Sequence, residues 1–170
     1  MPVNTCYPLL SAGFLESMTR FYLLHLSDLH LDAPFTALGL ERRTDLRATL
    51  GRILALARER RVDAVTIAGN LYEQDYALPD TAAFLAQQFA RLAPIRVFIA
   101  PGERDPYTND SLYALTRWPE NVTIFSQGQL TSVELTPGVT LWGAACPPAR
   151  GGATLDGFQC ERPGINLLLL

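Results

Sequence analysis

Lysine is absent from this chain, and histidine is scarce. All 14 basic residues are arginine, and with 17 acidic residues the net charge is −3. A weakly acidic chain is not expected to attract nucleic acid over its whole surface, although a local basic groove remains open. Only His25 and His30 can supply an imidazole, which limits any histidine ligand set to these two residues.

Cysteine is also rare. Cys6, Cys146 and Cys160 lie far apart, are odd in number and form no Cys-x-x-Cys pair. This pattern argues against a disulfide framework or a zinc knuckle and fits a reducing cytoplasm.

Long apolar runs are missing. No segment approaches the roughly 20 apolar residues that a membrane-spanning helix needs. No basic residue precedes the short apolar stretch at residues 7–10, as a secretory signal would require. We therefore expect a cytoplasmic protein with no membrane partner.

The composition is that of a globular protein. Hydrophobic residues make up 48% of the 170 residues and charged residues 18%, enough apolar material for one domain with its own core. Met18 looks like a natural start, so residues 1–17 are expected to be a disordered extension or a start-site misassignment. Residues 18–170 then form a single domain.

Short apolar runs alternate with helical patterns in the first part of the chain. The runs at 21–26, 62–68 and 95–100 predict strands. Between them, apolar residues recur at helical spacing over 41–61 and from 79 to 92. This alternation predicts parallel βαβ units with right-handed crossovers and helices on one face of the sheet.

The pattern changes after about residue 122. Short strands are predicted at 122–125, 130–135, 139–142 and 165–170, separated by glycine and proline turns. These features favour a second, more antiparallel sheet packed against the first. The predicted fold class is α/β, a mixed sheet structure with parallel βαβ units.

Three short polar segments directly follow the predicted parallel strands. They are Ser27-Asp28-Leu29-His30, Gly69-Asn70 and Gly102-Glu103-Arg104-Asp105. The carboxyl ends of parallel strands meet at one edge of the sheet, where functional crevices lie. We therefore expect these segments to converge. The Asp-x-His pair in the first segment has the residue types and spacing of metal ligands.

At these residues the chain resembles the calcineurin-like metallophosphoesterases. The stretches 25–35, 62–72 and 101–107 carry the resemblance, and the last is similar to a Pro-Gly-Asn-His-Asp-Pro-Tyr motif. Within the family, the chain looks closest to the bacterial DNA-repair exonuclease branch. The resemblance covers roughly residues 20–125 and implies the N-terminal part of a four-layer αββα sandwich.

The resemblance also implies an activity, a cofactor and partners. Such proteins hydrolyse phosphoesters with two divalent metals about 4 Å apart, which activate a water and neutralise charge on the phosphate. Manganese is the expected ion. Nucleic acid or another phosphoester is the expected substrate, and an ATPase-type repair protein is the expected partner.

The metal-ligand positions follow from the resemblance residue by residue. Asp28 and His30 match ligands of the first metal, whereas Asn70 stands where the family has a bridging aspartate. A neutral amide is a poorer bridge than a carboxylate because it removes a negative charge between two dications. Glu103 stands at a metal-binding asparagine and is either a replacement oxygen ligand or a solvated loop residue.

The catalytic positions depart from the family pattern as well. Arg104 stands at the catalytic histidine, and Asp105 matches the aspartate that often orients it. Arginine does not titrate usefully as a general acid, but it can bind a phosphate. Alternatively, residues 103–105 form a local ion-paired loop. The family's later histidines have no counterpart, and His25 is expected to be a core histidine.

Residues beside the site have two interpretations. Tyr72, Glu73 and Tyr107 either contact substrate or pack the loops. The arginines of the predicted helix are expected to form mostly a solvated face rather than a nucleic-acid stripe; those considered are Arg42, Arg43, Arg47, Arg58, Arg60 and Arg61.

Together these features predict a nuclease-like metallophosphoesterase with impaired catalysis and weak or absent metal binding. Two alternatives stay open: a non-catalytic binding or scaffold module, and a fragment whose other ligands come from elsewhere. Residues 165–170 resemble the strand before the family's next histidine motif. The domain 18–170 is therefore expected to be incomplete, with an exposed sheet edge that favours self-association.

Overall fold

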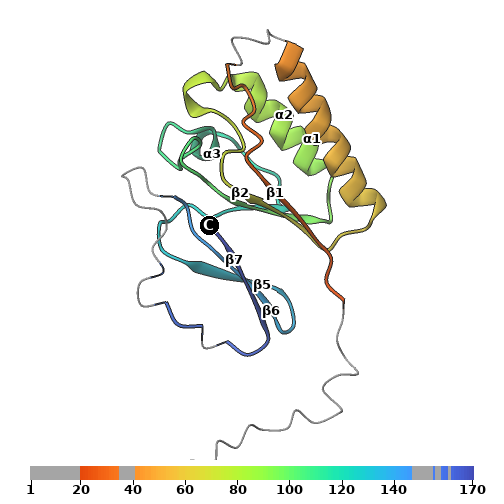
Figure 1. Cartoon of the computed structure of the whole chain (residues 1–170), viewed down its shortest axis with the longest axis vertical. Coiled ribbons are helices and arrows are strands. Elements are labelled where there is room, and N and C mark those ends of the chain that lie inside the picture. Colours follow the sequence, from red (N-terminus) through yellow and green to blue (C-terminus); the bar gives the residue numbers. More distant parts are fainter. Residues whose placement is uncertain (1–19, 35–40, 147–154, 156–157, 161) are drawn as a thin grey trace, which may run out of the picture.

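The structure is a computed structural model that describes residues 20–34, 41–146, 155, 158–160 and 162–170 (Figure 1). The extension expected at residues 1–17 lies outside the described residues. In the part of the chain that is described, no helix is long and apolar enough to cross a membrane.

The first sheet contains four parallel strands in the order β1-β2-β3-β4. Two helices connect them and cover one face of the sheet (Figure 1). The elements are β1 (Leu23–Ser27), α1 (Glu41–Glu59), β2 (Ala64–Ala68), α2 (Pro79–Ala90), β3 (Arg96–Ala100) and β4 (Val122–Ile124). The predicted α/β fold with parallel βαβ units is confirmed.

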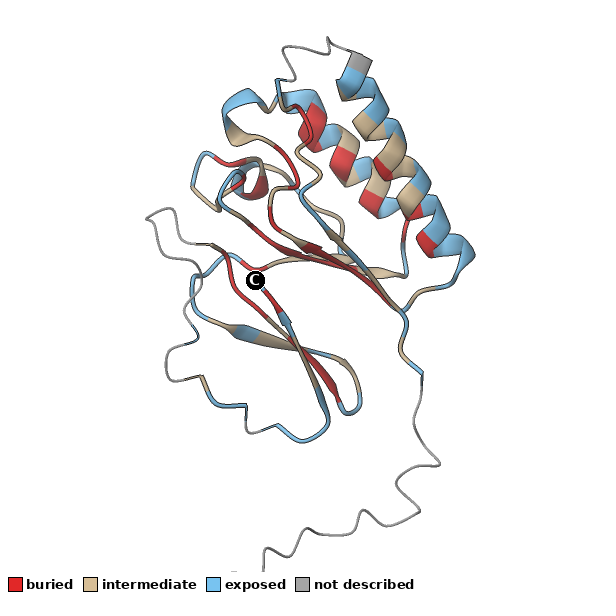
Figure 2. Ribbon diagram, viewed as in Figure 1, coloured by how far each residue is buried: buried red, intermediate tan, exposed pale blue. Residues whose placement is uncertain are grey.

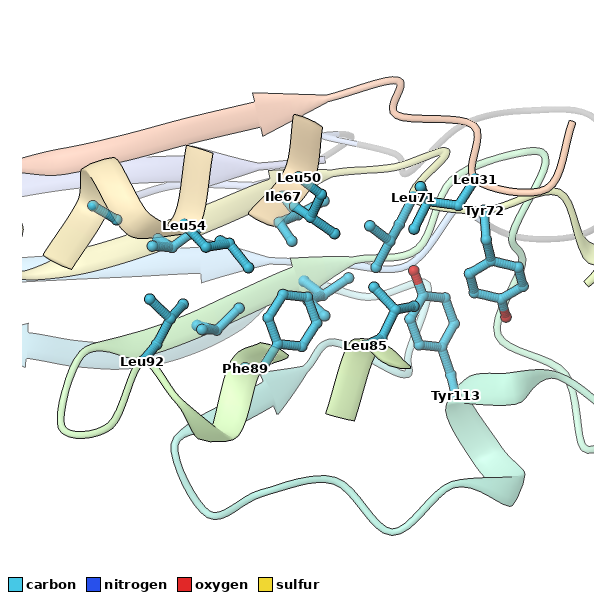
Figure 3. Packing of buried hydrophobic residues seen from close by; sticks show 14 residues of the cluster. Leu31, Leu50, Leu54, Ile67, Leu71, Tyr72, Leu85, Phe89, Leu92 and Tyr113 are labelled. Atoms are coloured by element: carbon cyan, nitrogen blue, oxygen red, sulfur yellow. The ribbon is translucent and has the colours of Figure 1, made fainter. Parts of the chain in front are cut away.

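The main core lies between this sheet and the two helices. Val65 and Ile67 of β2 alternate with residues that face the other way, because successive side chains of a strand point to opposite faces. They pack against Leu50 of α1 and against Leu85 and Phe89 of α2, all fully buried (Figures 2 and 3). The apolar stripes predicted for both helices are therefore the faces that hold the helices on the sheet.

A second sheet packs against the opposite face of the first (Figure 1). It contains β5 (Thr131–Thr136), β6 (Val139–Gly143) and β7 (Ile165–Leu169) in that order. The pair β5–β6 is antiparallel and the pair β6–β7 is parallel, so the sheet is mixed. Phe98 of the first sheet and Leu141 of the second share the smaller core between the sheets.

The prediction for residues 122–125 was wrong in its sheet. Val122 pairs in parallel with Val97, so β4 extends the first sheet rather than the second. The connection after β3 is long enough for a crossover, which parallel pairing requires. It includes the one-turn helix α3 (Leu112–Leu115). Neither α3 nor the 3₁₀ helix η2 (Gln74–Tyr76) had been predicted.

The prediction that His25 is a core histidine was also wrong. Its ring Nδ1 lies 3.0 Å from the Thr66 hydroxyl, so the imidazole has a polar partner. However, β1 is the first strand in the sheet order and has a neighbour on one side only among the described strands. His25 is consequently exposed at this edge. Self-association through an exposed edge stays a prediction.

Candidate metal centre

The chain leaves β1 in an unusual conformation. Asp28, His30 and Asp32 have positive φ angles of 55°, 46° and 66°, in the left-handed region that non-glycine residues seldom occupy. The segment is held beside the continuation of β2, since the His30 N–H donates to the Asn70 carbonyl at 2.8 Å and the Leu31 N–H to the Leu71 carbonyl at 3.0 Å. The Asp28-x-His30 pair therefore lies next to Asn70, as predicted from the strand ends.

The segments after β2 and β3 meet at two glycines. Gly69 has a φ of 65°, and a Cβ on Gly102 would lie 2.8 Å from both the Gly69 Cα and the Asn70 side-chain oxygen. No real Cβ tolerates such contacts without a shift of the backbone. Glycine at 102 is thus what allows the third polar segment to reach Asn70.

Asp105 ties the two segments together. Its Oδ1 accepts hydrogen bonds from the backbone N–H groups of Asn70 at 2.8 Å and Gly102 at 2.7 Å. Its Oδ2 accepts from the Leu71 N–H at 2.7 Å and from the Tyr113 hydroxyl at 2.6 Å. The carboxylate is fully buried; this burial raises its pKa, and its hydrogen bonds act in the opposite direction.

The side chain of Asn70 bridges all three segments. Its Oδ1 accepts the Arg104 backbone N–H at 3.0 Å, and its Nδ2 donates to Asp28 Oδ1 at 2.8 Å. A backbone N–H can only donate, so the amide oxygen must face Arg104 and the NH₂ group must face Asp28. The hydrogen bond from Asn70 Nδ2 is the largest cause of the lowered pKa of Asp28, and a hydrogen bond with the Ser27 side chain is the second.

His30 is oriented by a carboxylate that sequence reasoning had treated only as a neighbour of the cleft. His30 Nδ1 lies 2.6 Å from Glu73 Oε1, and His30 Nε2 lies 3.6 Å from Asp28 Oδ1. An ionised Glu73 fixes the proton on Nδ1 and leaves Nε2 directed toward Asp28. The only signal for this pairing was that Glu73 follows Asn70 by three residues, on the segment that pairs with residues 28–31.

The side chains of Glu103 and Arg104 are exposed and make no hydrogen bond or ion pair with any other residue the structure describes. The alternative of an ion-paired loop at 103–105 is therefore not what the structure shows, because the Asp105 carboxylate accepts hydrogen bonds from four other donors. Glu103 does act electrostatically on Cys146, whose pKa is raised first by burial and then by this charge. Roles for Glu103 as a ligand and for Arg104 in catalysis stay predictions.

Of the two tyrosines beside the site, Tyr72 serves packing. Tyr72 is fully buried, and its ring centroid lies 5.1 Å from that of Tyr113 (Figure 3). Tyr107 is half-buried against the same core. Of the two interpretations offered for these residues, loop packing is the one that fits Tyr72, because a side chain with no exposed surface cannot contact substrate in this conformation.

A partly buried ionic cluster holds Asp32, two residues beyond His30; the Asp32 side chain is buried, whereas that of Asp80 is exposed. Asp32 Oδ1 accepts a hydrogen bond from Arg43 Nε at 2.6 Å, and Asp32 Oδ2 accepts one from the Thr81 hydroxyl. Arg43 and Arg47 also donate to Asp80, at 2.7 and 2.9 Å. The expectation of a solvated arginine face was therefore wrong for Arg43 and Arg47 of α1. They connect the segment that follows β1 to α2.

The potential metal-ligand atoms at this edge of the sheet suit one cation better than two. Asp28 Oδ1 and His30 Nε2 face each other and could both ligate one ion. Asn70, in contrast, presents an NH₂ group to the same Asp28 oxygen, and an N–H group is not a metal ligand. Among the described residues, no group of three or more His, Cys, Asp or Glu side chains is arranged to hold a metal ion. The residues present do not fit a two-metal centre in this arrangement.

Comparison with known proteins identifies the class. An α/β sandwich with polar residues at the carboxyl ends of its parallel strands is an architecture for binding and chemistry at that edge. Residues 21–167 match the calcineurin-like phosphoesterase family model, and the chain belongs to that family. Members of this family generally use divalent metals.

One relative is an uncharacterized metallophosphoesterase of Bacillus subtilis (strain 168), YhaO. It is 29% identical to the chain over 118 residues. The matched part is 64% of this chain but 28% of the relative, so the chain spans well under half of the relative's length. The chain therefore shares the N-terminal metallophosphoesterase architecture of the family. The match does not extend to the whole length of the relative.

Proposed function

We propose that this protein is a nuclease-like phosphodiesterase relative whose two-metal catalysis is impaired. The observation that supports the proposal is the hydrogen bond from Asn70 Nδ2 to Asp28 Oδ1 at 2.8 Å. A bridging carboxylate would place negative charge between two dications, whereas the amide places a donor there. Asp28 is thereby satisfied by the protein itself.

A single divalent cation, manganese in the first instance, is proposed to bind weakly through Asp28 Oδ1 and His30 Nε2. Glu73 supports this ligation, since a carboxylate on the other imidazole nitrogen orients a histidine and raises its basicity as a ligand. A bound cation would supply Lewis-acid stabilisation of phosphate charge. The substrate class proposed is a phosphodiester of nucleic acid, by similarity to the DNA-repair exonuclease branch, in the cytoplasm.

Hydrolysis of bis-p-nitrophenyl phosphate in the presence of manganese tests the proposal. We expect little or no turnover by the wild-type chain. Robust hydrolysis that is abolished by EDTA and half-maximal at micromolar manganese would refute the impairment.

Restoring the family residues tests whether the substitutions at the site itself are what weakens metal binding. The variant Asn70→Asp, Glu103→Asn, Arg104→His restores the family residues at the three departed positions. It is expected to bind manganese more tightly in calorimetry, because a carboxylate replaces the Asn70 amide and an imidazole replaces a cation. The matched control Asn70→Ser removes the amide without adding a carboxylate and is expected not to gain affinity. Equal affinity for all three proteins would show that the site is placed wrongly.

A non-catalytic binding module is the second candidate function. It is favoured by the polar groups at the site, which satisfy one another without an ion: Asn70 bonds Asp28, and Glu73 bonds His30. This function predicts a stable complex with a partner, such as an ATPase-type repair protein, that persists after chelation of metals. A complex that dissociates with EDTA would instead support a metal-dependent role.

A further inference from the structure

Two side-chain hydrogen bonds join the same pair of segments beside the metal centre. One segment directly follows β1 and carries His30 and Asp32. The other, the lead-in to α2 (residues 73–81), passes through η2 into the first turn of α2. His30 Nδ1 lies 2.6 Å from Glu73 Oε1, at the start of the lead-in. The Thr81 hydroxyl, at its end, donates to Asp32 Oδ2. The contact that orients His30 is therefore accompanied by a second tie, two residues further along the first segment.

The middle of the lead-in to α2 is exposed. All but one of residues 75–80 are exposed to solvent. Near the start of the lead-in, the Glu73 N–H donates to the Leu31 carbonyl and the Gln74 N–H to the Arg104 carbonyl, both at 2.9 Å. A segment with few buried apolar contacts opens locally at a low free-energy cost. The place of the Glu73 carboxylate consequently depends on how firmly the far end of the lead-in is held.

The far end is held at a buried position. Thr81 has no exposed surface, and the side chain of Asp32 is only 2% exposed. The Thr81 hydroxyl donates to Asp32 and accepts a hydrogen bond from Arg47 Nη2 at 2.7 Å. Hydrogen bonds to ionised groups are stronger than neutral ones, and a low local dielectric strengthens them further. Loss of this one hydroxyl removes both the donor to Asp32 Oδ2 and an acceptor for Arg47.

We propose that Thr81 and Asp32 are positioning residues for the metal centre. Their hydrogen bond holds the lead-in to α2 in place and thereby keeps the Glu73 carboxylate on His30 Nδ1. A histidine held in this way presents Nε2 as a ligand and is more basic. The two residues act through Glu73 and the main chain, not as ligands. The consequence for metal binding rests on the proposed cation site at Asp28 and His30, whereas the effect on the imidazole does not.

A matched pair of substitutions at Thr81 tests the proposal. Thr81→Val keeps the shape of the side chain and removes the hydroxyl, whereas Thr81→Ser keeps the hydroxyl and removes a methyl group. Both should lower the melting temperature, so a purely structural effect does not separate them.

The readout is the pair of imidazole ¹⁵N chemical shifts of each histidine in metal-free protein at pH 8. The chain has only His25 and His30, so His25 serves as an internal reference. In Thr81→Val the His30 shifts are expected to move away from the pattern of an Nδ1-protonated ring. In Thr81→Ser they should stay as in wild type, and the His25 shifts should stay constant in both variants.

A manganese titration, followed by paramagnetic broadening of the His30 signals, gives a second readout. The half-maximal concentration is expected to rise by about threefold or more in Thr81→Val and to stay within about twofold of wild type in Thr81→Ser. If manganese leaves the wild-type His30 signals unchanged, the proposed cation site is refuted, and the metal-free shifts still decide the positioning role.

Asp32→Asn provides a second route if Thr81→Val does not fold. It removes the charge that pairs with Arg43 and should move the His30 shifts in the same direction. The positioning role is overturned if Thr81→Val and Thr81→Ser move the His30 shifts equally, if His25 moves as much as His30, or if the folded Thr81→Val or Asp32→Asn protein keeps the wild-type His30 shifts.

Discussion

Asp105→Asn is expected to destabilise the fold although it replaces only one oxygen by nitrogen. The amide oxygen can keep the hydrogen bonds from the Asn70 and Gly102 N–H groups. The new NH₂ group then faces the Leu71 N–H, which now bonds Asp105 at 2.7 Å. Leu71 is fully buried, so its N–H finds no water to replace the lost acceptor.

The size of the effect follows from these contacts. A buried N–H without an acceptor costs about 1–3 kcal/mol, and bonds to a neutral amide oxygen are weaker than bonds to a carboxylate. We therefore expect the free energy of unfolding to fall by about 2–4 kcal/mol. Against a typical total of about 5–15 kcal/mol, such a loss is easily measured.

Equilibrium unfolding in guanidinium chloride, followed by tryptophan fluorescence, is the measurement. Trp118 reports on this region, since its indole N–H donates to the Tyr113 carbonyl at 3.0 Å. Tyr113→Phe removes one of the four donors and leaves the carboxylate in place, so it should cost only about 0.5–1.5 kcal/mol. Asp75→Asn makes the same exchange at an exposed aspartate whose side chain has no hydrogen bond or ion pair with another described residue, and it should leave the midpoint unchanged. An Asp105→Asn midpoint equal to that of wild type would refute the role of Asp105 in holding the segments together.

Three further predictions concern the same edge of the sheet and its support. Asn70→Asp sets two carboxylates side by side, so the melting temperature should fall without metal and rise with added manganese more than that of wild type; equal manganese shifts in scanning fluorimetry would contradict the site. The pKa of Asp80 lies below 3.8 because Arg47 and Arg43 donate to it. Its contribution to stability is therefore present above pH 3.8 and is lost as the pH falls through the lower folded pKa. Asp80→Asn should accordingly lower the unfolding midpoint near neutral pH and not in strong acid, and a pH-independent difference would show that charge is not the cause. Gly102→Ala should cost about 1–3 kcal/mol through its contacts with Gly69 and Asn70, whereas Gly51→Ala should stabilise the fold by about 0.5–1 kcal/mol; denaturant midpoints that shift in the same direction would refute this contrast.

Most elements could be predicted because their signals are local. The apolar run at 95–100 and the helical stripe from residue 79 became β3 and α2 nearly as expected. The convergence of Asp28, His30 and Asn70 was also predictable, since parallel strands end at one edge. The sheet to which β4 belongs was not, because its parallel pairing with β3 depends on a crossover that local sequence does not reveal.

The chemistry of the site was predictable in residue type but not in contact. Glu73 became the partner of His30, and the buried Asp32 became the centre of a partly exposed ionic cluster. The hydrogen bonds that do this join residues 43 and 49 positions apart in the chain. His25 was expected in the core and is exposed, because exposure depends on whether a strand lies at an edge.

The sequence by itself determined the α/β class, the positions of the strand ends and the polar residues that follow them, because hydrophobic periodicity and strand-end chemistry are properties of short segments. Only the tertiary structure decided how those residues meet. The Asn70 amide faces Asp28 because its oxygen is held by the Arg104 N–H from another strand end. The direction of a side-chain amide depends on its surroundings in space. Here the NH₂ group of Asn70 points to Asp28, so the three segments are joined by hydrogen bonds in an arrangement that does not fit a two-metal centre.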